Sequence, residues 1–376
     1  MTATARLQVL RPEQSAPWTE VLAQSLQYDF YHLAGYHRLA EQRGEGQAHL
    51  FVYREGPYLL ALPLLLRPLE AVPGLGQVGR GWWDATSVYG YAGPILSRGS
   101  VPPPVVQNFQ AALREALQER KVVAVFSRLH PLLPQREVLA GLGEYVPGGP
   151  TVSIDLTLPV DVQRARYRQD HKYGINKLRR LGVTCVHDPD RVYLPEFVYT
   201  YHEAMRRVKA ADAYFFDYAY FEKLLSTLPS IVHLFVCLWE KRVLCGGLFT
   251  LCDGLVQYHL SGTRDEFLKL APMKLLLDEV RLWANARGAR VFHLGGGVGS
   301  REDSLFQFKA GFSNRRHEFA TWRWVLLPDL YDRLCKEKAR WNRQNGLNPV
   351  SAPYFPEYRR PIMFTQAGID TQVPGS

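Results

Sequence analysis

A glycine run followed by a lysine is the part of the sequence best suited to chemistry on an anion or a carbonyl group. In HLGGGVGSREDSLFQFKAGF, Gly295, Gly296 and Gly297 follow a strand-like segment and precede a short helix near Ser304. Glycines at such a junction let backbone N–H groups approach a ligand closely. Lys309 lies farther along this otherwise apolar helix. Burying a lysine costs desolvation free energy unless an anion meets it, which favours a role in substrate binding.

The same glycines are compatible with a flexible turn before a helix. The segment lacks both the GxGxxG spacing of a dinucleotide site and the GxxxxGK[ST] pattern of a P-loop. Neither of these nucleotide sites is therefore predicted.

A second group places cations beside flat rings. In EAMRRVKAADAYFFDYAYFEKLL, Arg207 precedes Tyr214 and Phe216. Such an arrangement suits a nucleotide or a phosphorylated sugar. Packing in a core explains the aromatic residues equally well.

The third group is a basic segment, residues 161–180, which holds seven Lys or Arg and two Asp. A continuous helix over 161–181 would place Arg164, Arg168, Lys172 and Arg179 on one stripe. This stripe fits a phosphate backbone, although a charged helix face is often only solvated.

Other chemistries find no support in the spacing of residues. The eleven histidines and five cysteines form no HExxH, CxxC or paired zinc-ligand pattern, and GxSxG is also lacking. We predict no metal and no cofactor. The cysteines lie mostly in apolar runs, typical of buried thiols in a reducing compartment, and no apolar targeting segment is recognisable, so a cytoplasmic protein is expected.

Composition and length indicate a globular protein of two domains. The 376 residues are 47% hydrophobic, 12% aromatic and 22% charged, which excludes a disordered or fibrous chain. The net charge of +9 favours an anionic partner, and nucleic acid, phosphate cofactors and anionic membranes all remain open.

Hydrophobic periodicity predicts two mixed α/β units. The first has a strand at 6–10, helices at 17–26 and 33–43, a strand hairpin (HLFVYRE, YLLALPLLL), an aromatic loop (GRGWWDATSVYGYAGP), a helix at 105–120 and strands KVVAVFSRL and TVSIDLTL. The second has helices at 161–181, 195–208 and 218–228, three strands, a helix at 273–287, a strand, a short helix at 303–310, another strand and a last helix. We predict domains at 1–158 and 159–346 and an extended tail at 347–376. The long aromatic loop is a candidate binding loop.

Four blocks in one order carry a family resemblance. AMRRVKAADAYFF, YHLSGT, LAPMKLLLDEVRLWANARGA and FHLGGG…SLFQFKAGF resemble the Fem-type aminoacyltransferases, which move an amino acid from aminoacyl-tRNA to an amine. The resemblance covers residues 160–325 by motif and 30–158 by element order and the SVYGYAGP loop. It implies an α+β fold of two tandem GNAT-like (acyl-CoA N-acyltransferase-like) domains with mixed sheets flanked by helices. It also implies a role in peptidoglycan (cell-wall) precursor synthesis.

The resemblance also assigns roles to residues. Lys309 matches the family lysine near the acyl-transfer site, where a cation can stabilise an oxyanion. Arg207 resembles the family arginine that grips the diphosphate of a nucleotide-linked precursor, and the substrate-binding set is completed by Tyr214, Phe216, Tyr258, Gly295, Gly296, Gly297 and Ser304. The basic segment, with Arg164, Arg168, Lys172 and Arg179, resembles the part that meets tRNA.

The group that accepts the proton of the attacking amine is left open. Asp84 in the aromatic loop is the carboxylate we name as catalytic, and Glu302, Asp303 and Glu318 are further candidates. The leaving hydroxyl of the ester is another. The sequence does not rank them.

Two other functions compete with this prediction. One is a GNAT N-acyltransferase that uses acyl-CoA, but the segment RDEFLKLAPMK lacks the glycines of the RxxGxG/A turn that binds its pyrophosphate. The other is a non-enzymatic RNA- or precursor-binding protein.

The chain also lacks the long charged coiled-coil insertion that some Fem-type members carry. The acceptor stays open between a lipid-linked muropeptide, a nucleotide-linked one and a small amine.

Overall fold

The first half of the chain builds strands and helices in close agreement with its hydrophobic pattern. The computed structural model describes residues 6–363. The elements are β1 (Arg6–Leu10), α1 (Ser15–Ala23), α2 (Ala34–Gln42), β2 (Gln47–Glu55), β3 (Tyr58–Pro68), β4 (Trp83–Thr86), β5 (Ile95–Leu96), α3 (Pro103–Glu119), β6 (Val122–Arg128), α4 (Arg136–Leu139) and β7 (Glu144–Asp155). The predicted hairpin is β2–β3, which turns at Gly56 with φ +54°.

The second half follows the same order, with extra helices at its start. Its helices are α5 (Val160–Ala165), α6 (Gln169–Arg180), α7 (Leu194–Arg207), α8 (Tyr218–Thr227), α9 (Met273–Ala286), α10 (Ser304–Ala310) and α11 (Pro328–Gln344). Its strands are β8 (Thr184–His187), β9 (Val232–Trp239), β10 (Arg242–Cys252), β11 (Leu255–Thr263), β12 (Val291–Gly295) and β13 (Arg315–Val325).

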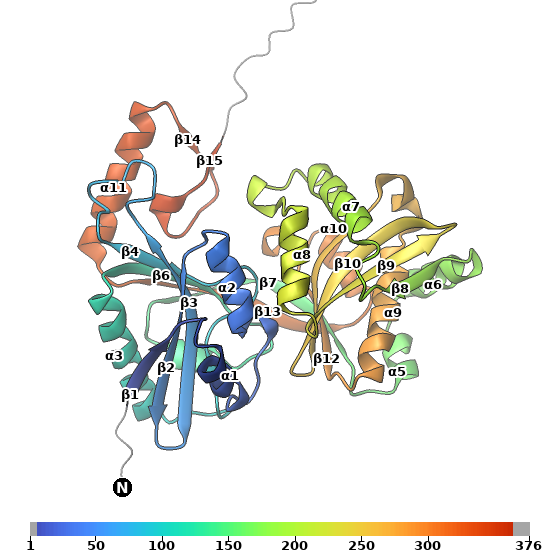
Figure 1. Cartoon of the computed structure of the whole chain (residues 1–376), viewed down its shortest axis with the longest axis horizontal. Coiled ribbons are helices and arrows are strands. Elements are labelled where there is room, and N and C mark those ends of the chain that lie inside the picture. Colours follow the sequence, from blue (N-terminus) through green and yellow to red (C-terminus); the bar gives the residue numbers. More distant parts are fainter. Residues whose placement is uncertain (1–5, 364–376) are drawn as a thin grey trace, which may run out of the picture.

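One parallel strand pair in each half reveals the duplication. The long helix α3 connects β4 to the parallel strand β6, and α9 connects β11 to the parallel strand β12. The strands that precede each pair run antiparallel. Helices flank the sheet on both sides (Figure 1). This arrangement confirms the predicted α+β fold of two tandem units with mixed sheets flanked by helices.

Strands β7 and β13, the last strand of each half, join the strands of both halves into one sheet. Its order is β1-β2-β3-β4-β6-β13-β7-β12-β11-β10-β9-β8, with β5 paired to β3. Strand β13 from the second half therefore lies between β6 and β7, and β7 from the first half pairs with β12. A division of the chain at residue 158 remains a proposal, because β7 and β13 cross between the halves.

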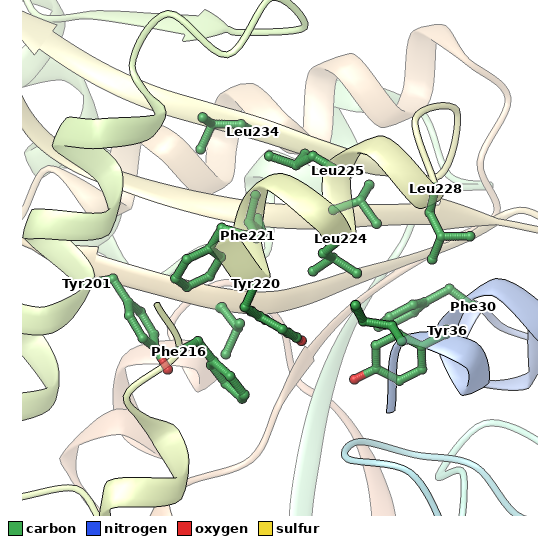
Figure 2. Packing of buried hydrophobic residues seen from close by; sticks show 14 of the residues in the cluster. Phe30, Tyr36, Tyr201, Phe216, Tyr220, Phe221, Leu224, Leu225, Leu228 and Leu234 are labelled. Atoms are coloured by element: carbon green, nitrogen blue, oxygen red, sulfur yellow. The ribbon is translucent and has the colours of Figure 1, made fainter. Parts of the chain in front are cut away.

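An aromatic cluster packs the two halves against each other. Figure 2 shows Phe30 and Tyr36 of the first half beside the ring of Tyr220 on α8. Phe216 stacks on Tyr220 with ring centroids 4.3 Å apart. Truncating a buried aromatic side chain costs about 3–5 kcal/mol, so these rings hold the halves together.

The basic segment is not the single helix that its periodicity predicts. Helix α5 ends at Ala165 and α6 begins at Gln169. Between them Tyr167 is 3% exposed, and its hydroxyl donates to the buried carboxylate of Asp278 at 3.1 Å. Because Tyr167 is buried in the segment between α5 and α6, the predicted single helix is interrupted there. The continuous stripe of Arg164, Arg168, Lys172 and Arg179 therefore does not form.

The tail prediction is corrected for residues 348–363. There β14 (Asn348–Pro349) pairs with β15 (Ile362–Met363), and a 3₁₀ turn (Glu357–Arg359) packs against α11. Tyr358 is fully buried against the first half, in a cluster with Leu69 and Leu75. Residues 364–376 lie outside the described residues. Within residues 6–363, no helix is long and apolar enough to cross a membrane.

Candidate functional site

The site is built where β11 and β12 separate. The two strands pair in parallel only from Leu255↔Val291 to Gln257↔His293. Beyond that point β11 continues to Thr263, whereas β12 follows β7 through Gly295. Ligands of sheets with parallel strands bind where the carboxyl ends of such strands separate.

Lys309 lies between the separating strands. Its Nζ donates to the carbonyl oxygen of Gly296 at 2.6 Å and lies 5.5 Å from the ring centroid of Tyr258 on β11. Only 8% of Lys309 is exposed. Burial lowers the pKa of its ammonium group to about 8. At neutral pH the group is thus a cation with two further N–H donors and little competition from water.

The loop before α10 holds Lys309 in place. Asp303 caps α10 by accepting the backbone N–H of Phe306 at 3.0 Å, and it also accepts that of Val298 at 3.1 Å. A Cβ at Gly297 would lie 2.0 Å from the Arg301 carbonyl oxygen, so only glycine fits there. The glycines, Asp303 and the short helix α10 thus fix the position from which the Lys309 side chain extends between β11 and β12.

Gly295 marks the meeting point of the two halves. It has φ +76°, and a Cβ there would lie 3.2 Å from Lys309 Nζ and 3.4 Å from the Tyr91 hydroxyl. Tyr91 belongs to the aromatic loop of the first half. Its ring packs edge-on against His293, with centroids 5.2 Å apart, and burial raises its pKa to about 12. The predicted binding loop therefore reaches the site of the second half.

A narrow groove with a free volume of only about 10 Å³ lies between the halves at the same loop. It is lined by Tyr36, Leu39, Ala40, Arg43, Glu45, Val88, Tyr89, Phe216 and Tyr220. The Arg43 guanidinium lies over the rings of Phe216 and Tyr220, 4.7 and 4.6 Å from their centroids. Arg43 Nε also donates to the Glu45 carboxylate at 2.7 Å, so the cation faces an anionic substrate only if it leaves Glu45.

The structure brings only part of the predicted substrate set to Lys309. Tyr258, Gly295 and Gly296 surround the lysine. Tyr214 and Phe216 lie instead against Tyr89, with centroids 5.8 and 6.2 Å away. Ser304 is exposed in the first turn of α10. Arg207 is bound to the Asp265 carboxylate and to the Thr263 carbonyl oxygen.

Asp84 does not reach Lys309 in the structure. It is fully buried on β4, where Arg67 Nε donates to it at 2.8 Å and Arg359 Nε at 2.5 Å. Two guanidinium groups occupy both of its oxygens, so the carboxylate fits a structural ion pair rather than a proton acceptor. The sequence could not show this, because Arg359 lies in the segment expected to be an extended tail.

Two of the four predicted tRNA-binding cations pair with a buried carboxylate, although the Arg179 side chain is still 39% exposed. Arg164 and Arg179 both donate to Oδ2 of Asp278, at 2.6 and 2.9 Å, and that carboxylate is fully buried. Arg168 remains half exposed beside Asp170, and Lys172 donates to the Ala165 carbonyl oxygen.

Three functional candidates carry no signal in the sequence. Arg43 follows a short helix, and His293 and Gln257 sit inside apolar strands. Tyr91 had only the signal of its unusually long loop, and only the fold brings Gln257 to His293. Among residues 6–363, no group of three or more His, Cys, Asp or Glu is arranged to hold a metal ion.

Comparison with known proteins places the fold among solved structures. Residues 165–309 match the family model described as an acetyltransferase (GNAT) domain. FemX matches 87% of this chain and 99% of its own, with a TM-score of 0.67 and 12% identity. L-PGS from Bacillus licheniformis matches 83% and 92%, with a TM-score of 0.50 and 16% identity. A conserved protein of unknown function from Bacteroides thetaiotaomicron matches 85% and 99%, with a TM-score of 0.53 and 10% identity.

No curated protein matches the sequence significantly. The fold is that of GNAT-type acyltransferases and supports an acyltransferase. More closely, it is the Fem-like arrangement of two such units, as the sequence resemblance predicts.

Proposed function

We propose that the protein is an aminoacyltransferase that moves an amino acid from aminoacyl-tRNA to an amine of a cell-wall precursor or related peptide in the cytoplasm. The observation that carries this proposal is the buried ammonium of Lys309 between β11 and β12, beside the groove that joins the halves.

The chemistry required is aminolysis of an ester. The amine nitrogen bonds to the carbonyl carbon, the C–O bond to the ribose breaks, and the amine proton ends on the leaving hydroxyl. Negative charge develops on the carbonyl oxygen in between. Lys309 presents a cation in a site nearly closed to water, where such a charge is strongly stabilised. Positioning of the two substrates supplies the remaining acceleration.

The connection between β11 and α9 argues against acyl-CoA as the donor. The carboxylates of Glu203, Asp265 and Glu266 lie there, and the Asp265 N–H already donates to Glu203 at 2.8 Å. These carboxylates are paired with Arg207, Arg242 and Arg264, so an acyl-CoA diphosphate would have to displace them from the arginines, and it would also lack the Asp265 amide donor. The helix α9 also begins after Pro272, which has no N–H.

The corresponding connection of the first half is equally unsuited. Helix α3 follows Pro102 and begins with Pro103 and Pro104, so three successive residues offer no N–H to a phosphate. In the same connection between β4 and α3, the carbonyl oxygens of Ala92 and Pro94 each accept a hydrogen bond from the Gln135 side chain at 2.8 Å.

The groove around Arg43 is the part we assign to the acceptor. It reaches from α2 to α8 and shares the Tyr89–Tyr91 loop with the Lys309 site. A peptide with an anionic group binds here only if this narrow groove opens and Arg43 leaves Glu45, and its amine then extends towards Gly295. The family role of Arg207 in gripping a diphosphate remains part of the proposal, and it requires release of that arginine from Asp265.

The test is transfer of radiolabel from a pool of charged tRNAs to nucleotide-linked and lipid-linked muropeptides, with labelled acetyl-CoA in parallel. RNase-sensitive labelling of a muropeptide is the expected result and names the amino acid. Labelling from acetyl-CoA alone would overturn the proposal. Salt-dependent tRNA binding without transfer from either donor would favour a binding protein instead.

A further inference from the structure

A chain of buried polar groups links the first half to the site and ends on an unpartnered nitrogen of His293. Its members are Asp29 before α2, His130 after β6, Gln257 on β11 and His293 on β12. All four are at most 3% exposed. Buried polar atoms are nearly always hydrogen-bonded, so an atom without a partner calls for an explanation.

The carboxylate of Asp29 fixes the direction of the chain. A carboxylate only accepts hydrogen bonds. Its Oδ2 lies 2.6 Å from Gln257 Nε2 and 3.0 Å from His130 Nε2, so both of these nitrogens carry the hydrogen. His130 Nδ1 accepts the backbone N–H of Leu132 at 3.1 Å, which agrees with this assignment.

The orientation of Gln257 then sets the tautomer of His293. Because the amide nitrogen faces Asp29, the amide oxygen Oε1 faces His293 Nδ1, at 2.7 Å. An oxygen there accepts, so Nδ1 carries the proton of the neutral imidazole. His293 Nε2 is left with a lone pair, and it is buried with no hydrogen-bond partner.

The surroundings keep His293 neutral and near the reacting groups. Burial, with the charges of His130, His317 and Lys309, holds the pKa of His293 well below its usual range. The Tyr91 ring packs against the imidazole, and its hydroxyl lies beside Lys309 at Gly295. The Tyr91 side chain therefore contacts His293 with its ring and lies near Lys309 with its hydroxyl group.

We propose that His293 is the base of the transfer reaction: Nε2 takes the proton from the attacking amine and returns it to the leaving ribose oxygen. The inference rests on the proposed function. It supplies the proton acceptor for which Asp84 is unsuited, and it makes Gln257 and Asp29 positioning residues that hold the tautomer. Because the Tyr91 ring packs on the imidazole, the proposal requires this ring to move aside when the amine binds.

The neighbouring carboxylates are engaged elsewhere. Asp303 accepts two backbone N–H groups at the start of α10, and Glu318 accepts the Tyr145 hydroxyl at 2.7 Å. Glu302 is exposed before α10. None of the three combines burial, a fixed lone pair and a contact with Tyr91.

The first test measures the tautomer without using activity. In protein labelled with ¹⁵N-histidine, long-range ¹H–¹⁵N spectra distinguish the two tautomers, and the His293→Gln variant assigns the signal. We expect Nδ1 protonated and Nε2 unprotonated in the wild type. A signal with Nε2 protonated would overturn the proposal.

The second test measures single-turnover transfer from aminoacyl-tRNA. His293→Gln should lower the rate by about 10²-fold or more, a typical effect of losing a general base, with tRNA binding unchanged. The matched control is His187→Gln, because His187 lies on β8 at the edge of the sheet, contacts His233 at 3.3 Å and should leave the rate near that of the wild type. An undiminished rate in His293→Gln overturns the base.

Chemical rescue separates a base from a structural residue. In His293→Ala, added imidazole should restore part of the lost rate, whereas a purely structural loss would not respond. Failure of rescue in a variant that melts like the wild type would overturn the proposal. If the wild type itself transfers no amino acid, the proposed function is wrong, and so is the role of His293 as its base. This result differs from one in which the wild type is active and only the His293 tests fail.

Discussion

Lys309 of the second half and Tyr91 of the first half meet over the α-carbon of Gly295. A Cβ on that glycine would lie 3.2 Å from the lysine Nζ and 3.4 Å from the tyrosine hydroxyl. Both halves of the molecule thus contribute a side chain to the candidate site.

Gly295→Ala should disturb this site beyond the effect of backbone strain. Gly295 has φ +76°, so alanine costs about 1–2 kcal/mol of conformational energy there. The new methyl group also presses on Lys309 and Tyr91. We expect the transfer rate to fall at least about tenfold, in line with loss of precise positioning.

Gly288→Ala is the matched control, measured by urea unfolding and single-turnover transfer. Gly288 has φ +69° after α9, and a Cβ there would meet nothing within 4 Å. It should lose similar stability and keep the rate. Equal transfer rates in Gly295→Ala and Gly288→Ala would argue against a role in the reaction for the space between Gly295, Lys309 and Tyr91.

The pH dependence of transfer should report Lys309. Its pKa is lowered to about 8 by burial, and the proposed role requires the cation. The rate should therefore fall as pH rises through about 8. In Lys309→Arg the guanidinium stays charged, so this alkaline limb should disappear even if the maximal rate is lower. An unchanged limb in Lys309→Arg would assign it to another group.

Asp84→Asn should reduce stability and leave transfer intact. Asp84 is fully buried between Arg67 and Arg359. Removing one partner of a buried ion pair costs about 3–5 kcal/mol, and the arginines are partly exposed, so we expect the lower end. Denaturant unfolding and the rate per folded molecule check this. A rate loss larger than the loss of folded protein would return Asp84 to the mechanism.

Arg164, which pairs with buried Asp278, and the half-exposed Arg168 should behave differently. Arg168→Ala should weaken tRNA binding and reduce the slope of log K against log salt by roughly 0.7–0.9, the loss of one phosphate contact. Arg164→Ala removes a partner of buried Asp278 and should mainly lower the melting temperature. Filter binding over a salt series and thermal unfolding separate the two. The reverse pattern would show that Arg164 faces the tRNA.

Local signals in the sequence were sufficient for most elements. The β2–β3 hairpin follows from two apolar runs around Gly56, and α9 ends before Gly288, whose φ of +69° suits a helix stop. The order of these elements predicted the duplication. The break between α5 and α6 was missed because it depends on burial of Tyr167 against Asp278, a contact across 111 residues.

The site was predictable only where its residues are neighbours in the chain. Gly295, Gly296 and Lys309 stand in one motif, and Tyr91 in a loop of unusual length. The Asp29–Gln257 contact spans 228 residues, and Asp84 meets Arg359 across 275. No periodicity links such pairs, so the sequence showed neither the arginine partners of Asp84 nor the hydrogen-bonded chain that leads us to propose His293.

The most direct test of the account is the transfer rate of Lys309→Ala from aminoacyl-tRNA to a muropeptide amine. Lys338→Ala is the matched control, because Lys338 is also buried and donates to a backbone carbonyl, that of Pro73, at 2.9 Å. We predict that Lys309→Ala loses about 10²-fold or more of the rate, the effect of removing one oxyanion donor, while Lys338→Ala keeps it. Transfer by Lys309→Ala at the wild-type rate would contradict the account.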